Sequence, residues 1–291
     1  MNRTLRLGTR GSLLAKTQSQ WVADQLVGLR IDLQIIETAG DDLNISLTKP
    51  VVPGAFVNAL RQELLAGKVD FIVHSFKDLP SMPHPEILIA AVPTREDHRD
   101  VLISKNNVQF NQLPNGALIG TSSPRRVASI QQLNPTLRTE PIRGNVDSRI
   151  KKVRDGQYDA AILAAAGIKR IGRQADIAQY FEVTEIIPAP AQGALAVECR
   201  QTDYELIKIL SQLDHAQSHL TSTAERAVLQ RLNAGCDLPI GAFASLDGNQ
   251  LTLIAQLGIQ DYVTKTIQIS NLNDLQSAQL LGESIADEFH I

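Results

Sequence analysis

Hydrophobic positions in the first part of the chain alternate between short apolar runs and segments with helical spacing. Strands are expected at 5–7, 31–36 and 69–73, and helices at 13–27 and 56–65. Alternating strands and helices predict parallel βαβ units. The stretch 38–54 fits neither period and is rich in glycine and proline. Because structureless loops of that length are uncommon in compact domains, we expect a functional lid or a flexible segment there.

The same alternation begins again near residue 118. Strands are expected at 118–119, 137–141 and 159–163, and helices at 127–133 and 146–154. Short pieces also repeat, since GTRGS (8–12) and GTSSP (120–124) each stand between a strand and a helix. These patterns predict two α/β domains of similar build. The segments 93–100 and 186–193, which are rich in charge or proline, are expected to connect them.

The last third of the chain has a different pattern. After a strand at 194–200 and a helix at 203–213, we expect a helix at 221–232, strands at 241–246, 251–258 and 263–269, and a helix at 275–289. Short turns join the three consecutive strands, which predicts a small antiparallel sheet. A third, α+β domain is therefore expected at the C-terminal end.

The composition is that of a globular protein. Of the 291 residues, 43% are hydrophobic and 20% are charged, which is enough for a buried core. The net charge of -3 and the aromatic content of 4% disfavour nucleic acid as a partner. Two cysteines, Cys199 and Cys236, are too few for a disulfide framework and favour a reducing compartment. The sequence shows neither an apolar leader nor an apolar stretch long enough to span a bilayer, so we expect a cytoplasmic protein that binds no membrane.

Small hydroxyl residues and arginines stand together at two predicted helix starts. Ser12 and Ser122 can cap these helices, which is the simpler interpretation of the serines alone. Arg10 in the first piece, and Arg125 with Arg126 in the second, place positive charge where a helix dipole disfavours it. An anionic ligand would explain these arginines. The GxxxxGK[ST] pattern of P-loops is absent from the sequence, so carboxylates are favoured over nucleotide phosphates.

Two further basic pieces follow predicted strands. PIRGNVDSR contains Arg143, Gly144, Asn145 and Arg149, and GIKR ends at Arg170. A solvated basic surface is the ordinary interpretation of scattered lysines and arginines. Here, however, the basic residues lie beyond strand C-termini, where open α/β sheets bind ligands. Several arginines at such an edge predict a ligand with several carboxylates.

One acidic residue stands out in VDFIVHSFKDLP (69–80). The strand is expected to deliver His74, Ser75, Lys77 and Asp78 to its C-terminal end. A carboxylate among arginines can stabilise a developing cation or move a proton, whereas a surface pair with Lys77 would do neither. Cys236 has no adjacent histidine and no CxxC spacing, so by pattern alone an inert thiol is the ordinary interpretation. No metal site is predicted.

Taken together, these motifs resemble the porphobilinogen deaminase (hydroxymethylbilane synthase) family. The resemblance is carried, in order, by LRLGTRGSLLAKTQ, VHSFKDLP, GTSSPRR, RGNVDSR, AILAAAGIKR, PAPAQGALAVECR and ERAVLQRLNAGCDLPIGAFA. It covers about residues 5–245, and only the tail beyond Leu246 is nondescript. The resemblance implies a transferase of tetrapyrrole and haem biosynthesis.

The activity that this resemblance implies explains the choice of residues. Four porphobilinogen molecules, each a pyrrole with two carboxylates, are joined head to tail with loss of ammonia, and water releases linear hydroxymethylbilane. The chain of rings grows on a dipyrromethane cofactor, which a thioether binds to a cysteine. Such a polyanion needs local positive charge in a protein whose net charge is -3.

The resemblance also implies roles for individual residues. Asp78 matches the family's catalytic aspartate, which would stabilise cationic pyrroles and help to remove the final proton. Cys236 matches the cofactor-bearing cysteine, against the interpretation from pattern alone. Lys49 and Phe56 match the active-site loop. The other cofactor and substrate ligands implied are Arg10, Ser12, Ser75, Lys77, Thr121, Ser122, Ser123, Arg125, Arg126, Arg143, Gly144, Asn145, Arg149, Arg170 and Gln192.

Two positions depart from the family pattern. VVPG (51–54) stands where the family commonly has Gly-Gly-Lys-Gly, so one lysine contact of the loop is missing and Pro53 is expected to stiffen it. Ala234 replaces a glycine often found two places before the cysteine. Neither change touches Asp78 or Cys236, so we expect the chemistry to survive.

The family architecture implies three domains, of which the first two resemble the lobes of type II periplasmic binding proteins. Domain 1 would comprise 1–95 and 192–213, with the catalytic aspartate and the lid 38–56. Domain 2 would comprise 96–191, with the arginine-rich ligand side, and domain 3 would comprise 214–291, with the cofactor-bearing cysteine. A monomer is expected, whose lobes and lid shift as the bound chain lengthens.

Two other functions fit parts of the pattern. A two-lobed binding module for a carboxylated metabolite suits the twin domains, but it leaves Cys236 and the third domain without a role. A phosphoribosyltransferase could use anion loops of the GTSS type, but it would require an acidic metal site that the sequence does not offer.

Overall fold

The computed structural model describes residues 3–37, 55–234, 238–258 and 263–289, and the chain divides into two compact units. Unit 1 comprises Met1–Arg95 and Ala194–His219, and unit 2 comprises Glu96–Gly193 and Leu220–Ile291. The chain therefore passes from one unit to the other three times. The expected lid falls outside the described residues as far as Gly54. Among the described helices, none is long and apolar enough to cross a membrane.

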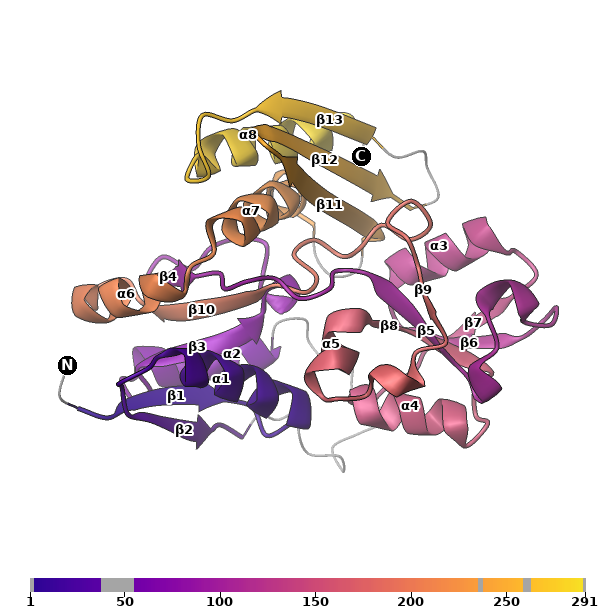
Figure 1. Cartoon of the computed structure of the whole chain (residues 1–291), viewed down its shortest axis with the longest axis horizontal. Coiled ribbons are helices and arrows are strands. Elements are labelled where there is room, and N and C mark those ends of the chain that lie inside the picture. Colours follow the sequence, from indigo (N-terminus) through magenta and orange to yellow (C-terminus); the bar gives the residue numbers. More distant parts are fainter. Residues whose placement is uncertain (1–2, 38–54, 235–237, 259–262, 290–291) are drawn as a thin grey trace. The chain divides into compact units, whose positions relative to one another are not determined.

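Unit 1 contains a five-stranded sheet. Its strands are β1 (Leu5–Thr9), β2 (Ile31–Ile35), β3 (Phe71–Ser75), β4 (Ile87–Ala91) and β10 (Leu195–Arg200), in the order β2-β1-β3-β10-β4 (Figure 1). β1 is parallel to β2 and to β3, which confirms the predicted βαβ units. β10 is antiparallel to β3 and β4, and it is the strand that the chain forms when it returns to unit 1.

Two apolar layers hold the helices of unit 1 on its sheet. The helices are α1 (Leu13–Gln25), α2 (Ala55–Leu65) and α6 (Tyr204–Leu210). α1 and α6 pack on one face, and α2 packs on the other through Leu60 and Leu64. β3 serves both layers, because Phe71 and Val73 enter the first and Ile72 enters the second. This alternation is what a strand buried on both faces requires.

Unit 2 contains a second sheet of the same design. Its strands are β5 (Asp100–Ser104), β6 (Leu118–Gly120), β7 (Arg138–Glu140), β8 (Ala160–Ala164) and β9 (Gln179–Tyr180), in the order β7-β6-β8-β5-β9. Each sheet contains three parallel neighbours, in the order β2-β1-β3 in unit 1 and β7-β6-β8 in unit 2. In both, the first strand of the repeat lies between the second and the third. An antiparallel strand that begins just after a crossing between units then follows. This shared order confirms two α/β domains of similar build.

The helices of the second sheet also divide between its two faces. They are α3 (Pro124–Leu133), α4 (Val146–Arg154) and α5 (Ala165–Arg170). α3 packs on one face through Ile130, together with Ile119 and Ile162 of the sheet. α4 and α5 pack on the other face, through Ile150 and Ile168.

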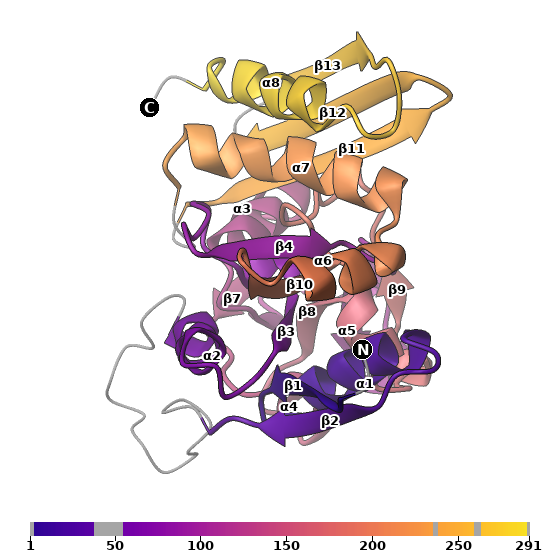
Figure 2. The same cartoon turned by 90° about the vertical axis from the view of Figure 1, so that its left-hand side faces the viewer.

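The C-terminal sheet belongs to unit 2 as well. β11 (Ile240–Asp247), β12 (Gln250–Leu257) and β13 (Val263–Gln268) pair antiparallel in sequence order, as the turns predict. α7 (Ala216–Arg231), which begins in unit 1, and α8 (Leu275–Ala286) cover one face of this sheet (Figure 2). The two helices approach closely at Gly282, where a Cβ would lie 2.3 Å from the Ala224 carbonyl oxygen. A larger residue at position 282 therefore has no room.

The hydrophobic pattern does not predict three of the strands. These are β4, β5 and β9. β9 is only two residues long, and β5 begins at Asp100, the last residue of a charged segment interpreted as a connection. The pattern also misses α5, because small apolar residues run from β8 into it without a polar boundary. Short 3₁₀ turns complete the described chain at Phe76–Asp78, Lys105–Asn107, Phe110–Gln112, Gln174–Asp176 and Ser211–Leu213.

Candidate functional site

In unit 1, two of the predicted motifs leave the same edge of the sheet. β1 ends at Thr9 and β3 ends at Ser75, and these strands are parallel neighbours. Side chains of α1 tie both strand ends together, since Ser19 Oγ donates to Thr9 Oγ1 at 2.8 Å and Gln18 Nε2 donates to Ser75 Oγ at 2.9 Å. The segment 10–12, with its arginine and serine, therefore lies at the edge to which β3 leads.

Asp78 is an exposed acid at this edge. It ends the 3₁₀ turn Phe76–Asp78, which begins directly after β3. Phe76 and Leu79 are 4% and 5% exposed and anchor the turn, and the Phe76 amide donates to the Ala194 carbonyl at 3.0 Å. The carboxylate of Asp78 thus stands on a fixed backbone beyond the end of β3, with the half-buried Lys77 beside it.

Beneath this edge lies a buried charged cluster that the sequence pattern does not reveal. Arg61 of α2 donates to Glu198 of β10 at 2.5 and 3.1 Å, and His74 Nε2 lies 3.5 Å from Glu198 Oε2. All three residues are at most 7% exposed. Burial lowers the pKa of His74 to about 4, although the charge of Glu198 acts in the opposite direction. His74 is therefore neutral near pH 7.

In unit 2, three basic segments leave one sheet edge. β6, β7 and β8 are parallel and lie in the order β7-β6-β8, so the segments 121–126, 141–145 and 165–170 follow neighbouring strand ends. Open α/β sheets bind ligands beyond this end of their strands. The predicted basic pieces of this unit are thus brought together by the strand directions alone.

The simplest interpretation of the pattern, in which Ser12 and Ser122 cap their helices, is confirmed for Ser12 and wrong for Ser122. Ser12 caps α1, since its Oγ accepts an amide hydrogen of that helix at 3.3 Å. In α3 the cap is Ser123, whose Oγ accepts from the Arg126 amide at 3.5 Å. Ser122 is exposed, and its hydroxyl donates to the Ile142 carbonyl at 2.9 Å. The segment Thr121–Ser123 therefore joins the loops after β6 and β7.

Arg125 and Arg126 are held inside unit 2 by an acid. Both are in the first turn of α3, and their guanidinium groups each lie 2.7 Å from the carboxylate of Asp100. Arg125 also donates to the Ile187 carbonyl at 2.6 Å, and Arg126 donates to the Ile162 carbonyl at 2.9 Å. Burial acts to raise the pKa of Asp100, but the two arginines hold it well below its usual value. The cluster therefore carries two positive charges and one negative charge.

Arg143 is exposed in the loop after β7, and within the described part of the chain its guanidinium has no partner. Gly144 follows with φ +110, and a Cβ there would lie 2.8 Å from Ser148 Cβ, so the turn requires glycine. Arg149 Nε donates back to the Gly144 carbonyl at 2.8 Å. Asn145, the N-cap residue of α4, is exposed, and its side chain makes no capping hydrogen bond.

Arg170 and Gln192 bind segments that connect the units. Arg170 Nη2 donates to the Gly193 carbonyl at 2.8 Å. Gln192 is fully buried, and its Nε2 donates to the His98 carbonyl at 2.8 Å and to Asp100 Oδ1 at 3.0 Å. Burial lowers the pKa of Arg170 to about 10, so it stays charged near pH 7.

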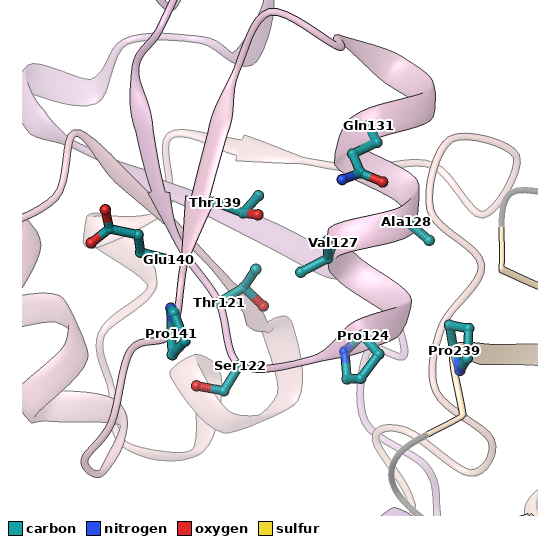
Figure 3. A pocket seen from close by; sticks show the side chains of 10 residues that line it. All are labelled: Thr121, Ser122, Pro124, Val127, Ala128, Gln131, Thr139, Glu140, Pro141 and Pro239. Atoms are coloured by element: carbon teal, nitrogen blue, oxygen red, sulfur yellow. The ribbon is translucent and has the colours of Figure 1, made fainter. Parts of the chain in front are cut away.

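A pocket of about 330 Å³ opens beside the start of α3 (Figure 3). Thr121 and Ser122 line it from the loop after β6, and Pro124 and Val127 line it from the helix. Pro239, which lies just before β11, completes the wall. The loop that precedes α3 and the start of the C-terminal sheet therefore share one pocket within unit 2.

Some expected residues fall outside what the structure describes. Lys49 and Cys236 lie outside the described residues, and of Phe56 only the backbone, in the first turn of α2, is described. Within the described ranges, His, Cys, Asp and Glu side chains form no group of three that could hold a metal ion.

Comparison with known proteins places the whole chain in one family. The family model described as porphobilinogen deaminase, dipyromethane cofactor binding domain, matches residues 5–208, and the model described as porphobilinogen deaminase, C-terminal domain, matches residues 219–290. The chain is 44% identical over 294 residues to the porphobilinogen deaminase of Nocardia farcinica, an alignment that covers 98% of this chain and 85% of the relative.

A second relative and a solved structure complete the comparison. The porphobilinogen deaminase of Thermobifida fusca is 42% identical over 294 residues, which cover 97% of this chain and 92% of the relative. Among solved structures, the periplasmic VFT2 domain of Bordetella pertussis BvgS is 13% identical and has a TM-score of 0.43, covering 72% of this chain and 86% of that chain.

Proposed function

Because the chain belongs to the porphobilinogen deaminase family, we propose that it joins four porphobilinogen molecules into hydroxymethylbilane. Each joining step forms one carbon–carbon bond between pyrrole rings and releases one ammonia. One water molecule enters when the linear product leaves. Four porphobilinogen molecules and one water thus give one hydroxymethylbilane and four ammonia molecules, which makes the protein a transferase of tetrapyrrole biosynthesis.

The exposed carboxylate of Asp78 carries this proposal. It stands beyond the end of β3, at the sheet edge where Arg10 follows the neighbouring strand β1. Positive charge that develops on a pyrrole during joining is stabilised by a nearby carboxylate. Cations at the same edge, Arg10 and Lys77, would hold the carboxylates that the pyrrole itself carries. One edge therefore offers both kinds of group that the reaction requires.

The corresponding edge of unit 2 suits a dipyrromethane cofactor, which carries several carboxylates. Arg143 is exposed there, and the start of α3 offers hydroxyl and amide groups from 121–123. Below them, the two positive charges of Arg125 and Arg126 exceed the single negative charge of Asp100. Such a donor set fits a polyanion. When bound, the cofactor supplies the ring to which the first substrate is joined.

We assign the thioether attachment to Cys236. Pro239 follows it by three residues and lines the pocket beside Thr121 and Ser122. The described chain after Cys236 therefore begins next to the loop that would hold the cofactor. Lys49 and Phe56 are assigned to the loop over the substrate.

The proposal also includes the larger organisation of the enzyme. The division into domains 1–95 with 192–213, 96–191 and 214–291 is supported by the three separate sheets. We propose that the enzyme acts as a cytoplasmic monomer on free porphobilinogen, without nucleic acid or membrane as partner.

The intact mass of the purified protein tests this function. We expect a mass that exceeds the sequence by two linked pyrrole units, and we expect Cys236→Ser to lack the excess. Cys199→Ala is the matched control. The Cys199 thiol is fully buried, and burial raises its pKa to about 11, so it is unsuited to attack a pyrrole and the variant should keep the added mass.

Incubation with porphobilinogen then separates the enzyme from a binding module. The loaded protein should gain mass in steps of one pyrrole unit and release one ammonia for each step. A protein that binds porphobilinogen reversibly and never gains mass at Cys236 would show that the proposed function is wrong.

A further inference from the structure

The two chain segments that enter and leave the first part of unit 2 touch each other. The first enters at Glu96 and the second leaves at Gly193, and the Glu96 amide donates to the Gly193 carbonyl at 3.2 Å. Gly193 has φ +91, and a Cβ there would lie 2.3 Å from the Glu96 carbonyl oxygen. Because only glycine allows this approach, the two backbones are in direct contact where the chain crosses.

The last two residues of α5 hold these segments, one each. The Lys169 ammonium lies 3.0 Å from Asp97 Oδ2 and 3.3 Å from Glu96 Oε1, in the first segment. The Arg170 guanidinium donates to the Gly193 carbonyl, in the second segment, at 2.8 Å. We call Glu96, Asp97, Lys169, Arg170 and Gly193 the clasp.

The ion pairs of the clasp differ from loose surface contacts. The side chain of Asp97 is 8% exposed, and that of Lys169 is 28% exposed. Burial acts to raise the pKa of Asp97, but hydrogen bonds from Arg99 and Lys169 hold it well below its usual value. A carboxylate withdrawn from water depends strongly on its partners, so Lys169 and Arg99 together hold the first segment in place.

We propose that Lys169 is a positioning residue, which sets the place where Arg170 receives a carboxylate of the substrate. This inference rests on the proposed function, which gives Arg170 its ligand. Lys169 would not bind that ligand itself, because its ammonium is used by Glu96 and Asp97. Since Lys169 and Arg170 are adjacent, anchoring one to the first segment fixes the helix end that carries the other.

The clasp also couples ligand binding to the connection between the units. A ligand carboxylate competes with the Gly193 carbonyl for the Arg170 guanidinium. When the ligand binds Arg170, the Gly193 carbonyl loses one of the two hydrogen bonds that it accepts. Lys169 still holds the first segment. Occupancy of the site and the freedom of the second segment therefore change together.

Lys169→Met tests the assignment, because it removes the charge and keeps most of the side-chain length. We expect KM for porphobilinogen to rise roughly threefold to tenfold, with kcat and cofactor loading within about twofold of the wild type. If Lys169 only stabilised the fold, Lys169→Met would instead reduce the fraction of folded enzyme. The apparent kcat would then fall and KM would stay unchanged. Lys169→Arg keeps the charge and should restore KM. Lys151→Met is the control, because it removes an exposed ion pair with Asp155 on α4.

Hydrogen exchange of the Glu96 amide is a second readout, since this amide donates to the Gly193 carbonyl. Exchange should be faster in Lys169→Met and return to the wild-type rate in Lys169→Arg. Unchanged KM, unchanged exchange or a failed rescue by Lys169→Arg would each overturn the assignment.

A second variant and a separate readout distinguish failure of this inference from failure of the proposed function. If Lys169→Met does not fold, Glu96→Gln weakens the same link and should raise KM in the same direction, and an unchanged KM would overturn the assignment. A wild-type protein without covalent cofactor and without turnover would overturn the proposed function instead. The exchange rate of the Glu96 amide reports on the clasp separately from turnover.

Discussion

The carboxylate of Asp100 and the guanidinium of Arg126 form a buried ion pair, with 2.7 Å between Oδ1 and Nη2. Arg125 reaches the other oxygen at the same distance. Both arginines stand in the first turn of α3, where the helix dipole disfavours positive charge. From the sequence, an anionic ligand explains them, but the protein itself provides an anion. One of the two positive charges remains uncompensated within this cluster, and it is this excess that can attract a ligand.

Replacing Asp100 with asparagine should destabilise the protein strongly. Two buried guanidinium groups would lose this carboxylate, and breaking a buried pair costs about 3–5 kcal/mol. The free energy of unfolding in urea measures the loss. Asp147→Asn is the control, because Asp147 is 40% exposed and lies 3.7 Å from Arg173, so its loss should change stability by less than about 0.5 kcal/mol. Equal losses in both variants would contradict the role given to Asp100.

Asp78→Asn should abolish most of the turnover without affecting the fold. Asp78 is exposed, so the free energy of unfolding should change by less than about 0.5 kcal/mol. Loss of a carboxylate that stabilises developing positive charge should lower kcat by about a hundredfold or more. Ammonia release under saturating porphobilinogen measures kcat. Asp24→Asn, an exposed position on α1 of the same unit, should behave as the wild type, and a variant at Asp78 that keeps a tenth of the activity would exclude this role.

Arg143→Leu should stall the growing chain at an intermediate length. The exposed guanidinium is proposed to hold carboxylates of the bound rings, and a charged hydrogen bond of this kind contributes about 1.5–3 kcal/mol. The intact-mass spectrum of the enzyme during turnover shows which length accumulates. Arg138→Leu is the matched control, because Arg138 pairs at 3.5 Å with Glu140 on the surface of β7. A wild-type distribution of intermediates in Arg143→Leu would remove Arg143 from the site.

The local parts of this site follow from the sequence. An apolar run, a turn of small or hydroxyl residues and a helix occur twice, at 8–12 and 120–124. This pattern fixes both the strands and the edge to which their C-terminal ends lead. Parallel strand pairing then brings the basic segments of unit 2 together without further information. The acid at the end of β3 follows from the same reasoning.

The partners of the buried charges do not follow from the sequence. Glu198 meets Arg61, 137 residues earlier, because β10 returns to the first sheet between β3 and β4. Asp100 meets the arginines of α3 because β5 lies next to β8. Local patterns carry no information about such pairings. For the same reason the charged segment 93–100 suggests a solvated connection, although several of its charges are paired within unit 2.

Because His74 is buried, we expect the protein to lose stability at mildly acidic pH. Its pKa is lowered from 6.5 to about 4 in the folded protein, mainly by burial. Glu198 of β10 and Asp78 act to raise this pKa, while Arg61 of α2 and Arg10 act to lower it. Above pH 6.5 the imidazole is neutral in both states, so it adds no pH dependence. Between pH 6.5 and 4 the unfolded chain binds a proton that the folded protein does not, and the free energy of unfolding therefore falls as the pH falls.

The size of this effect can be measured against a variant that does not titrate. A lowered pKa of this size corresponds to a loss of about 2–3 kcal/mol across the interval. Urea unfolding at several pH values between 4 and 7 should show this loss in the wild type. His74→Gln removes the titrating group, so its unfolding free energy should depend less on pH by the same amount. Parallel curves for the two proteins would mean that folding leaves the pKa of His74 unchanged, and the predicted effect of burial would then be wrong.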